Sequence, residues 1–132
     1  SPVPGTVGGV FAWLQFHVSV TDRIRSMDDV QVRDQLRKFV EERDWRQFHT
    51  PENLAKSISI EAAELLECFQ WNSEGDRDAA RMELADVLTY AFLLADALGE
   101  SPHDLIVEKL ALTKAKYPVD RAFGKATKYD QL

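Results

Sequence analysis

Two pairs of acidic residues constrain this chain more than any other feature of its sequence. Glu61 and Glu64 form the first pair, and Glu83 and Asp86 form the second. Side chains three positions apart lie on the same face of an α-helix. If two consecutive helices carry the pairs, an antiparallel hairpin brings four carboxylates together. Like charges repel strongly in a poorly solvated site, so the cluster favours a divalent cation such as Mg²⁺, which prefers oxygen ligands.

The second pair lies in an unusually apolar helix, which runs over residues 82–98 and has almost no polar face. A helix of this kind is buried in a bundle or against another subunit. Asp86 therefore needs a partner, because burying an unpaired charge is costly. Glu83, Asp86 and Tyr90 fall within about 60° of one another around the helix and form a polar stripe. A single acidic pair is usually solvated surface, but this second pair favours a functional site.

Apolar periodicity and capping residues predict an all-α fold with no strand. Thr50 and Ser101 each precede a proline, a pattern typical of a helix start. Gly99 is typical of a helix end. The predicted fold is a four-helix bundle completed by oligomerisation, and its helices span residues 29–42, 51–71, 77–98 and 102–116. The tail over 119–132 is expected to be partly irregular.

Residues 1–26 differ in character from the rest of the chain. They begin with several prolines and glycines, and residues 14–20 alternate with the period of a strand. We expect this segment to be an N-terminal extension or a segment introduced for expression. The domain itself is expected to span residues 27–132, because Met27 and the acidic residues after it make a natural start.

Composition excludes several classes of function. The chain has 132 residues, a net charge of −6 and no basic run, which disfavours a nucleic-acid polymer as partner. No apolar run reaches the length of about 20 residues that crosses a membrane. The single cysteine, Cys68, cannot form an internal disulfide and is expected to be a small buried side chain. These observations favour a reducing, cytoplasmic setting.

An ordered set of motifs resembles the MazG-like nucleotide pyrophosphohydrolases of the all-α NTP pyrophosphatase superfamily, and most closely their dCTP pyrophosphatase branch. The resemblance extends from about Val30 to Tyr129. The motifs are Glu42-Arg43-Asp44-Trp45-Arg46-Gln47-Phe48-His49, Pro51-Glu52-Asn53-Leu54, Glu61-Ala62-Ala63-Glu64 leading to Phe69-Gln70-Trp71, Glu83-Leu84-Ala85-Asp86-Val87-Leu88, and Lys116-Tyr117-Pro118.

The resemblance implies that Glu61, Glu64, Glu83 and Asp86 hold Mg²⁺ against the triphosphate of a nucleotide. The implied reaction is hydrolysis between the α- and β-phosphates, which yields a nucleoside monophosphate and pyrophosphate. The implied role is cleansing of the nucleotide pool, with dCTP or a modified dCTP as the first candidate substrate. Members of the family are dimers or tetramers, so a homo-oligomer is expected.

The resemblance also implies a set of substrate-binding residues. Its base pocket matches Trp45, His49 and Trp71, while Asn53, Tyr90 and Lys109 match residues near the ligand. Spacing alone explains either tryptophan equally well as packing at a helix end. Thr113 stands where the family often has asparagine, so the contact made by that asparagine is weakened, replaced by Lys114 or lost.

Basic residues gather in the last quarter of an otherwise acidic chain and are suited to binding outer phosphates. For any one lysine, a solvated surface role is the commoner outcome. Tyr117 lies among them, in the segment that matches the family. The basic residues are Lys109, Lys114, Lys116, Arg121, Lys125 and Lys128.

Bound metal would neutralise charge at the α-phosphate and orient an attacking water. Either Glu61 or Glu64 is the candidate group that polarises this water, and the sequence does not choose between them. A di-iron bundle is disfavoured, because no histidine follows Glu61, Glu64 or Glu83 by three positions. A related enzyme of phosphoribosyl-ATP is disfavoured by the flanking tryptophans. A non-catalytic nucleotide sensor or a helical interaction module is the alternative function.

Overall fold

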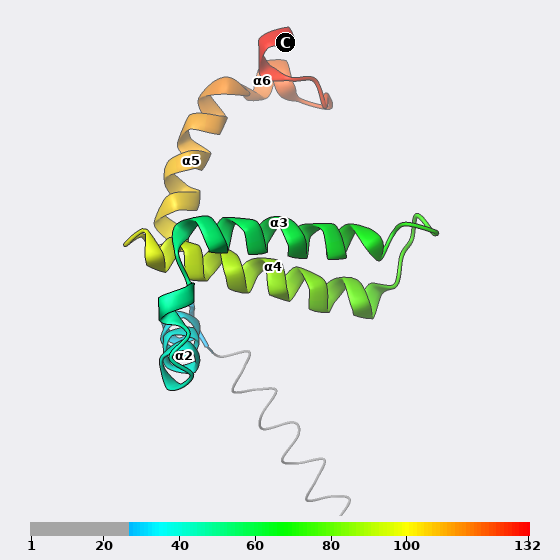
Figure 1. Cartoon of the computed structure of the whole chain (residues 1–132). Helices are drawn as coiled ribbons and strands as arrows, with labels where there is room; N and C mark the ends of the chain where they lie inside the picture. The colour runs from blue at the N-terminus through cyan, green and yellow to red at the C-terminus, as the bar shows by residue number, and fades with distance from the viewer. Residues whose placement is uncertain (1–26) are drawn as a thin grey trace, which may run out of the picture. The chain divides into compact units, whose positions relative to one another are not determined.

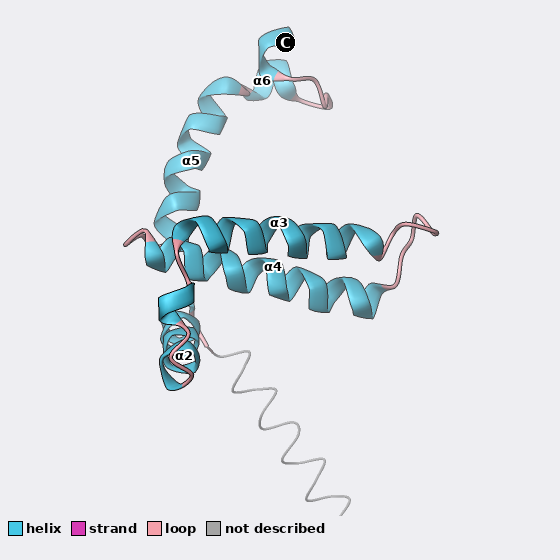
Figure 2. Cartoon of the chain, in the orientation of Figure 1, coloured by secondary structure: helices cyan, strands magenta, loops and turns pink. Residues whose placement is uncertain are grey.

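The computed structural model describes residues 27–132, so residues 1–26 and the expected extension lie outside the described part. The described residues form five α-helices and two short 3₁₀ turns, with no strand among them (Figures 1 and 2). The elements are α2 (Asp29–Glu42), η1 (Arg46–Phe48), α3 (Pro51–Glu67), α4 (Arg77–Ala97), α5 (Pro102–Lys116), α6 (Val119–Ala122) and η2 (Tyr129–Gln131).

The all-α prediction is confirmed, and local capping explains where the helices begin. Asp28 and Gln31 cap the start of α2 by exchanging hydrogen bonds between side chain and backbone, each 2.9 Å long. The Thr50 hydroxyl accepts the backbone N–H of Asn53 at 3.2 Å, ahead of the proline that opens α3. Asp76 accepts the first backbone N–H groups of α4.

Two helix predictions need correction. The second helix was expected to continue to residue 71, but α3 ends at Glu67. Beyond that point the backbone N–H groups of Phe69 and Gln70 bond to carbonyls only three residues back, and the Asp76 N–H closes the turn on the Cys68 carbonyl at 3.3 Å. The tail also contains the one-turn helix α6, which makes five α-helices in the described part where four were expected.

Helices α3 and α4 form an antiparallel hairpin and pack along each other over most of their length (Figure 1). α5 follows α4 after a short turn at Gly99, whose φ of 71° lies in the left-handed region that favours glycine. The hairpin is the element that matters for function, because the two predicted acidic pairs lie on α3 and α4.

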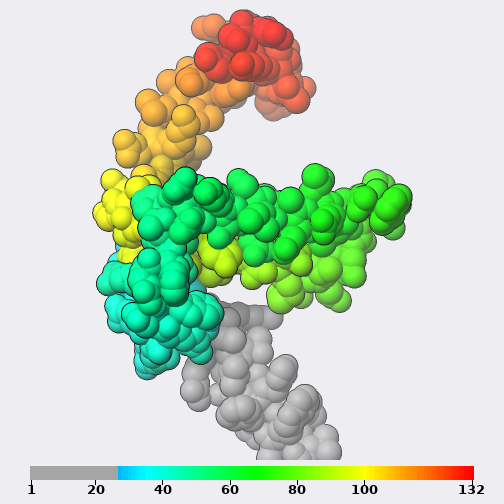
Figure 3. Space-filling view, in the orientation of Figure 1, coloured from blue at the N-terminus to red at the C-terminus, as the bar shows by residue number. Residues whose placement is uncertain are grey.

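Little of the hairpin is covered by the other described residues. Only four residues of the described part are buried, namely Val40, Leu54, Ala95 and Pro102. The apolar helix over residues 82–98 was expected to be buried in a bundle or against another subunit, and within the single chain Met82 is 59% exposed and Leu88 is 51% exposed. Figure 3 shows the surface of α3 uncovered on the visible face. No helix in the described part of the chain is long and apolar enough to span a membrane.

Candidate functional site

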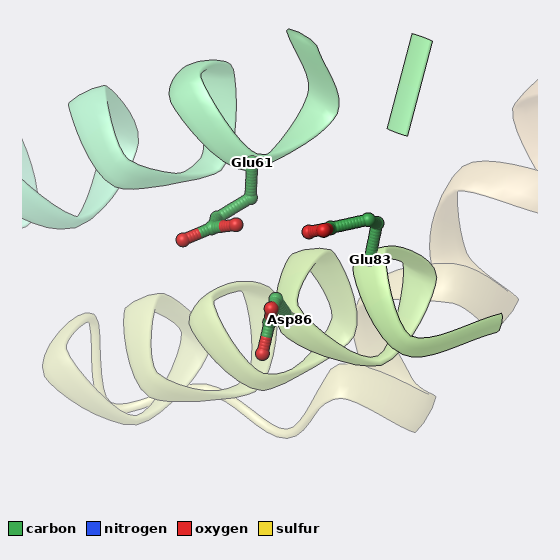
Figure 4. Close-up of side chains that lie close together, drawn as sticks. All are labelled: Glu61, Glu83 and Asp86. Atoms are coloured by element: carbon green, nitrogen blue, oxygen red, sulfur yellow. The ribbon is translucent and has the colours of Figure 1, made fainter. Parts of the chain in front are cut away.

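Three carboxylates converge between the two helices of the hairpin. Glu61 comes from α3, while Glu83 and Asp86 come from α4 one turn apart, and the side chains point toward a common region (Figure 4). One oxygen from each carboxylate lies within 4.8 Å of the other two. Glu61 and Glu83 are half-buried, whereas Asp86 is exposed. The antiparallel pairing of the helices thus brings acidic residues 22 positions apart to one point, as the sequence predicted.

Glu64, the fourth predicted ligand, lies beside this cluster but outside the closest group of three. It is near enough to hydrogen-bond with the side chains of both Glu61 and Glu83. Two carboxylates share a hydrogen bond only when one of them holds a proton. Glu64 is therefore an immediate neighbour of the cluster, and its role as a metal ligand stays a prediction.

The surroundings of the cluster disfavour the charged forms of Glu61 and Glu83. A hydrogen bond to Glu64, burial, and repulsion by Glu64, Asp86 and Glu83 together raise the pKa of Glu61 to about 7. Burial first, and then repulsion by Glu64, raise the pKa of Glu83 above its usual range. Glu61 Oε2 and Glu83 Oε2 are buried, and no donor among the described residues hydrogen-bonds to either atom. These two buried oxygens lack a hydrogen-bond partner, and a bound cation would take that place.

A pocket of about 370 Å³ opens next to the cluster, within the size range of small-molecule sites. Asp86 belongs to both, so the pocket and the acidic cluster share a wall. Three of the predicted substrate-binding residues, Trp45, His49 and Tyr90, line this pocket. The structure therefore joins an aromatic cavity to a group of carboxylates.

A short loop between α2 and α3 supplies two of the pocket's side chains. Trp45 and His49 flank the 3₁₀ turn η1 at its two ends. The Trp45 N–H bonds to the Val40 carbonyl at 3.1 Å, and the Trp45 ring meets the Phe39 ring edge-on at 5.6 Å. Trp45 is thereby held against the end of α2.

Sequence reasoning missed the remaining lining residues of the pocket. On α4, Thr89 and Leu93 follow Asp86 by three and seven positions, which places them on the same helix face. That spacing was a usable signal. The residues missed on α2 carried no such signal, because only tertiary packing brings them to α4; they are Leu36, Phe39 and Val40.

Several predicted substrate-binding residues do not line the pocket. Asn53 donates its side-chain amide to the Phe48 carbonyl at 3.1 Å, so it supports the loop that bears His49. Trp71 lies beyond the end of α3 and is 90% exposed. Lys109 and Lys114 lie on α5 and are exposed. Thr113, at the position often occupied by asparagine, donates its hydroxyl to the Lys109 carbonyl at 3.0 Å.

The last predicted residues contact the C-terminal segment instead. Tyr117 accepts the Tyr129 N–H at 3.3 Å and meets the Tyr129 ring edge-on at 6.1 Å. The Lys116 ammonium lies 4.7 Å from the centre of the same ring. Arg121 is exposed on α6. Within this chain, these three predicted residues are not part of the pocket lining.

The half-buried Cys68 follows α3 at its C-terminal end. Burial raises the pKa of its thiol, and repulsion by Glu83 acts in the same direction. A raised pKa lowers the thiolate fraction, so Cys68 lacks the character of a reactive nucleophile.

The fold and the site define an all-α protein whose helical hairpin carries a carboxylate cluster beside an aromatic pocket. The chain belongs to the MazG-like family, whose sequence model matches residues 56–132. A solved structure of a pyrophosphatase from Archaeoglobus fulgidus is 41% identical, with a TM-score of 0.61, and the match covers 64% of this chain and 87% of that one.

Curated relatives point to the same family. The chain is 36% identical over 105 residues to dCTP pyrophosphatase 1 of Rattus norvegicus and 34% identical over 105 residues to that of Homo sapiens. Each match covers 72% of this chain and 62% of the relative. The chain thus spans less than two thirds of the length of the curated relatives that it matches.

Proposed function

We propose that this protein is a Mg²⁺-dependent nucleoside triphosphate pyrophosphohydrolase. It would hydrolyse the bond between the α- and β-phosphates and release a nucleoside monophosphate and pyrophosphate. The observation that carries this proposal is the convergence of Glu61, Glu83 and Asp86, with two buried oxygens that accept no hydrogen bond. Membership of the MazG-like family and the likeness to two kinds of pyrophosphatase support it.

The donor set fits a hard divalent cation. All the candidate ligands are carboxylate oxygens, which suit Mg²⁺ better than the softer metals that prefer nitrogen or sulfur. No lysine or arginine of the described residues forms an ion pair with Glu61, Glu83 or Asp86, so nothing in that part of the chain neutralises their charge. Glu61, Glu83 and Asp86, joined by Glu64, would hold the metal. When bound, Mg²⁺ would screen the triphosphate charge and polarise the reacting phosphate.

The chain's own residues supply the proton transfer. A water oxygen attacks the α-phosphorus, the bond to the bridging oxygen breaks, and pyrophosphate leaves. Glu61 or Glu64 accepts the proton of the attacking water. In the metal-free chain a hydrogen bond to Glu64 raises the pKa of Glu61 to about 7; a bound cation would displace that proton and leave both carboxylates able to accept one from water.

The neighbouring pocket is proposed to bind the nucleotide base. Trp45 offers a face for stacking, while His49 and Tyr90 offer hydrogen-bonding groups. Asp86 connects the pocket with the cluster, so a base in the pocket leaves its phosphates beside the carboxylates. The first candidate substrate is dCTP or a modified dCTP, which rests on the relatives that carry that name.

The functional unit is proposed to be a homo-oligomer, a dimer or a tetramer. Large apolar side chains on α5 are exposed in the single chain, with Ile106 at 64% and Val107 at 63%. A second subunit would cover such a face. It would also be the source of the remaining predicted contacts, such as those of Trp71 and Lys109, which a single chain leaves outside the pocket.

The experiment is a panel of ribo-, deoxy- and modified triphosphates, assayed with Mg²⁺ and with chelator. The expected result is metal-dependent release of a monophosphate together with pyrophosphate, and the ranking of substrates identifies the base. Trp45→Ala should raise KM by about tenfold, because stacking of one base contributes about 1–3 kcal/mol. Metal-dependent binding without turnover would instead support the nucleotide sensor. Neither binding nor turnover, with the helices intact, would support an interaction module.

A further inference from the structure

An ion-pair network on the far side of His49 is not explained by metal or nucleotide chemistry. Asp96, on α4, accepts hydrogen bonds from Arg37 of α2, with Nε at 2.8 Å from Oδ1 and Nη2 bonded to the same oxygen. Its second oxygen lies 3.9 Å from Nη2 of Arg46. The Asp96 side chain is only 20% exposed. One carboxylate therefore joins α4 to α2 and to the loop after α2.

This network reaches the pocket through the backbone of η1. Arg46 is the first residue of η1, and its carbonyl accepts the backbone N–H of His49 at 3.1 Å. Trp45 directly precedes Arg46. Trp45 and His49, which line the pocket, thus flank the turn η1, and Arg46 at the start of this turn pairs with Asp96.

A second, smaller cavity lies between the ion-pair network and the larger pocket. It measures about 50 Å³, and its lining includes Arg37, Arg46 and Asp96. Val40, His49 and Leu93 line both this cavity and the larger pocket, so they form the wall between the two. A change in the ion-pair network would consequently alter the position of His49.

Local contacts shape the loop, and Asp96 ties it to α4. Asp44 has a φ of 53°, in the left-handed region that aspartate adopts more readily than most residues with a Cβ. Gln47 stabilises it from inside the loop by donating to the Asp44 carbonyl at 3.0 Å. None of these bonds connects the loop to α4. Asp96 supplies that connection through Arg46.

We propose that Asp96 is a positioning residue for the nucleotide base. Through Arg46 and Arg37 it fixes the loop so that Trp45 and His49 face the pocket, without touching the substrate itself. This inference rests on the proposed function, because it assigns the base to the larger pocket. It predicts that the Asp96 carboxylate controls nucleotide affinity rather than the rate of the chemical step.

The test compares two variants with one matched control. Asp96→Asn keeps the shape but removes the charge, and Arg46→Gln alters a side chain that is 68% exposed and is therefore safe for folding. The control is Glu52→Gln, which breaks the exposed pair with Lys56 on α3, at 3.5 Å, away from both cavities. The measurements are KM and kcat for the best triphosphate of the panel, and hydrogen exchange of residues 43–49 without nucleotide.

Asp96→Asn is expected to raise KM about tenfold while kcat changes less than about twofold, since a charge-assisted hydrogen bond is lost but the carboxylate cluster is intact. Arg46→Gln should raise KM by about two- to threefold, because its pair is longer and more exposed. Both variants should speed exchange in residues 43–49, and Asp96→Glu should restore part of the affinity. Glu52→Gln should change none of these values.

An unchanged KM in both Asp96→Asn and Arg46→Gln would overturn the inference while leaving the proposed function in place. A fall in kcat with unchanged KM would also overturn it, since that pattern belongs to the reacting groups. If Asp96→Asn does not fold, Arg46→Gln decides alone. Failure of the wild-type chain to bind any triphosphate would overturn the proposed function and this inference together.

Discussion

At the scale of single residues, the carboxylates of the cluster repel one another and together form a group that could bind a cation. Three carboxylates lie within 4.8 Å of one another, and the pKa values of Glu61 and Glu83 are both raised. A site arranged for stability alone would have paired these charges with lysine or arginine. The lack of such pairs among the described residues is what a cation-binding site requires.

Removing one carboxylate should separate activity from stability. Asp86→Asn is expected to lower turnover by about two orders of magnitude or more, because it removes a proposed ligand of the metal. The melting temperature of the metal-free protein should stay equal or rise, because one repelling charge is gone. Steady-state assays and thermal melting check both.

The matched control is Asp78→Asn, on the same helix, where the side chain is 94% exposed. It should keep full activity. Full activity in Asp86→Asn would show that the carboxylate site is wrong.

The raised pKa of Glu61 predicts a definite pH dependence. The unfolded chain releases this proton near pH 4.5, whereas the folded, metal-free chain keeps it until about pH 7. Between those values the folded state binds more protons, so the free energy of unfolding should fall as pH rises from 4.5 to 7. Mg²⁺ must displace the proton, so metal affinity should increase over the same range.

Thermal melting with chelator from pH 4.5 to 8 measures this slope. Glu61→Gln removes the titrating group and should flatten the curve, and added Mg²⁺ should oppose the decline in stability at neutral pH. An identical slope in wild type and Glu61→Gln would assign the effect to other groups.

At the scale of elements, the turn between α3 and α4 joins the two helices that carry the acidic pairs. Gly75 has a φ of 68°, and a Cβ there would lie 2.6 Å from the Phe69 ring and 3.0 Å from the Cys68 carbonyl. Neither the backbone conformation nor the space accommodates a larger residue. Glycine at position 75 therefore suits the turn that joins α3 to α4.

Gly75→Ala should lower the free energy of unfolding by about 2 kcal/mol through combined backbone strain and steric conflict. Gly99→Ala is the matched control, because Gly99 has a φ of 71° but no atom within 4 Å of the added Cβ. It should cost only about 1 kcal/mol, from backbone strain alone. Urea unfolding compares them, and equal losses would show that Phe69 and Cys68 do not constrain the turn.

At the scale of the whole molecule, the described part of the chain buries too few apolar side chains to explain its composition. Ile106, Val107 and Leu110 of α5 are exposed, and so are Leu84 and Leu88 of α4. Exposed apolar surface of this extent is typical of an interaction face. We expect the protein to associate with copies of itself in solution.

Sedimentation equilibrium should give two or four times the mass of the 15.0 kDa chain. Ile106→Glu places a charge on the exposed face of α5 and should shift the mass toward the monomer. Glu108→Gln, on the same helix, should leave the mass unchanged. A monomer at concentrations of about 50 μM would contradict the expected affinity of an obligate interface.

Local signals in the sequence determined most of the secondary structure. Proline after Thr50 and after Ser101, and glycine at position 99, placed helix ends that the structure confirms. The end of α3 was predicted four residues too late, because the apolar pattern continues through Phe69 into a turn that forms by hydrogen bonding across to Asp76. Helix ends without a local stop signal depend on such longer contacts.

The sequence also predicted the carboxylate cluster. When two consecutive helices each carry an acidic pair, packing them as an antiparallel hairpin can bring the pairs together. Only the tertiary structure decided the rest of the site. Side chains of residues 36–40 and of α4 came together to line the pocket beside Asp86, and the bonds from Asp96 to Arg37 and Arg46 linked it to the loop of Trp45 and His49. The physical reason is distance along the chain. Helical periodicity relates residues within a few turns, whereas contacts between residues 40–60 positions apart form only when helices pack.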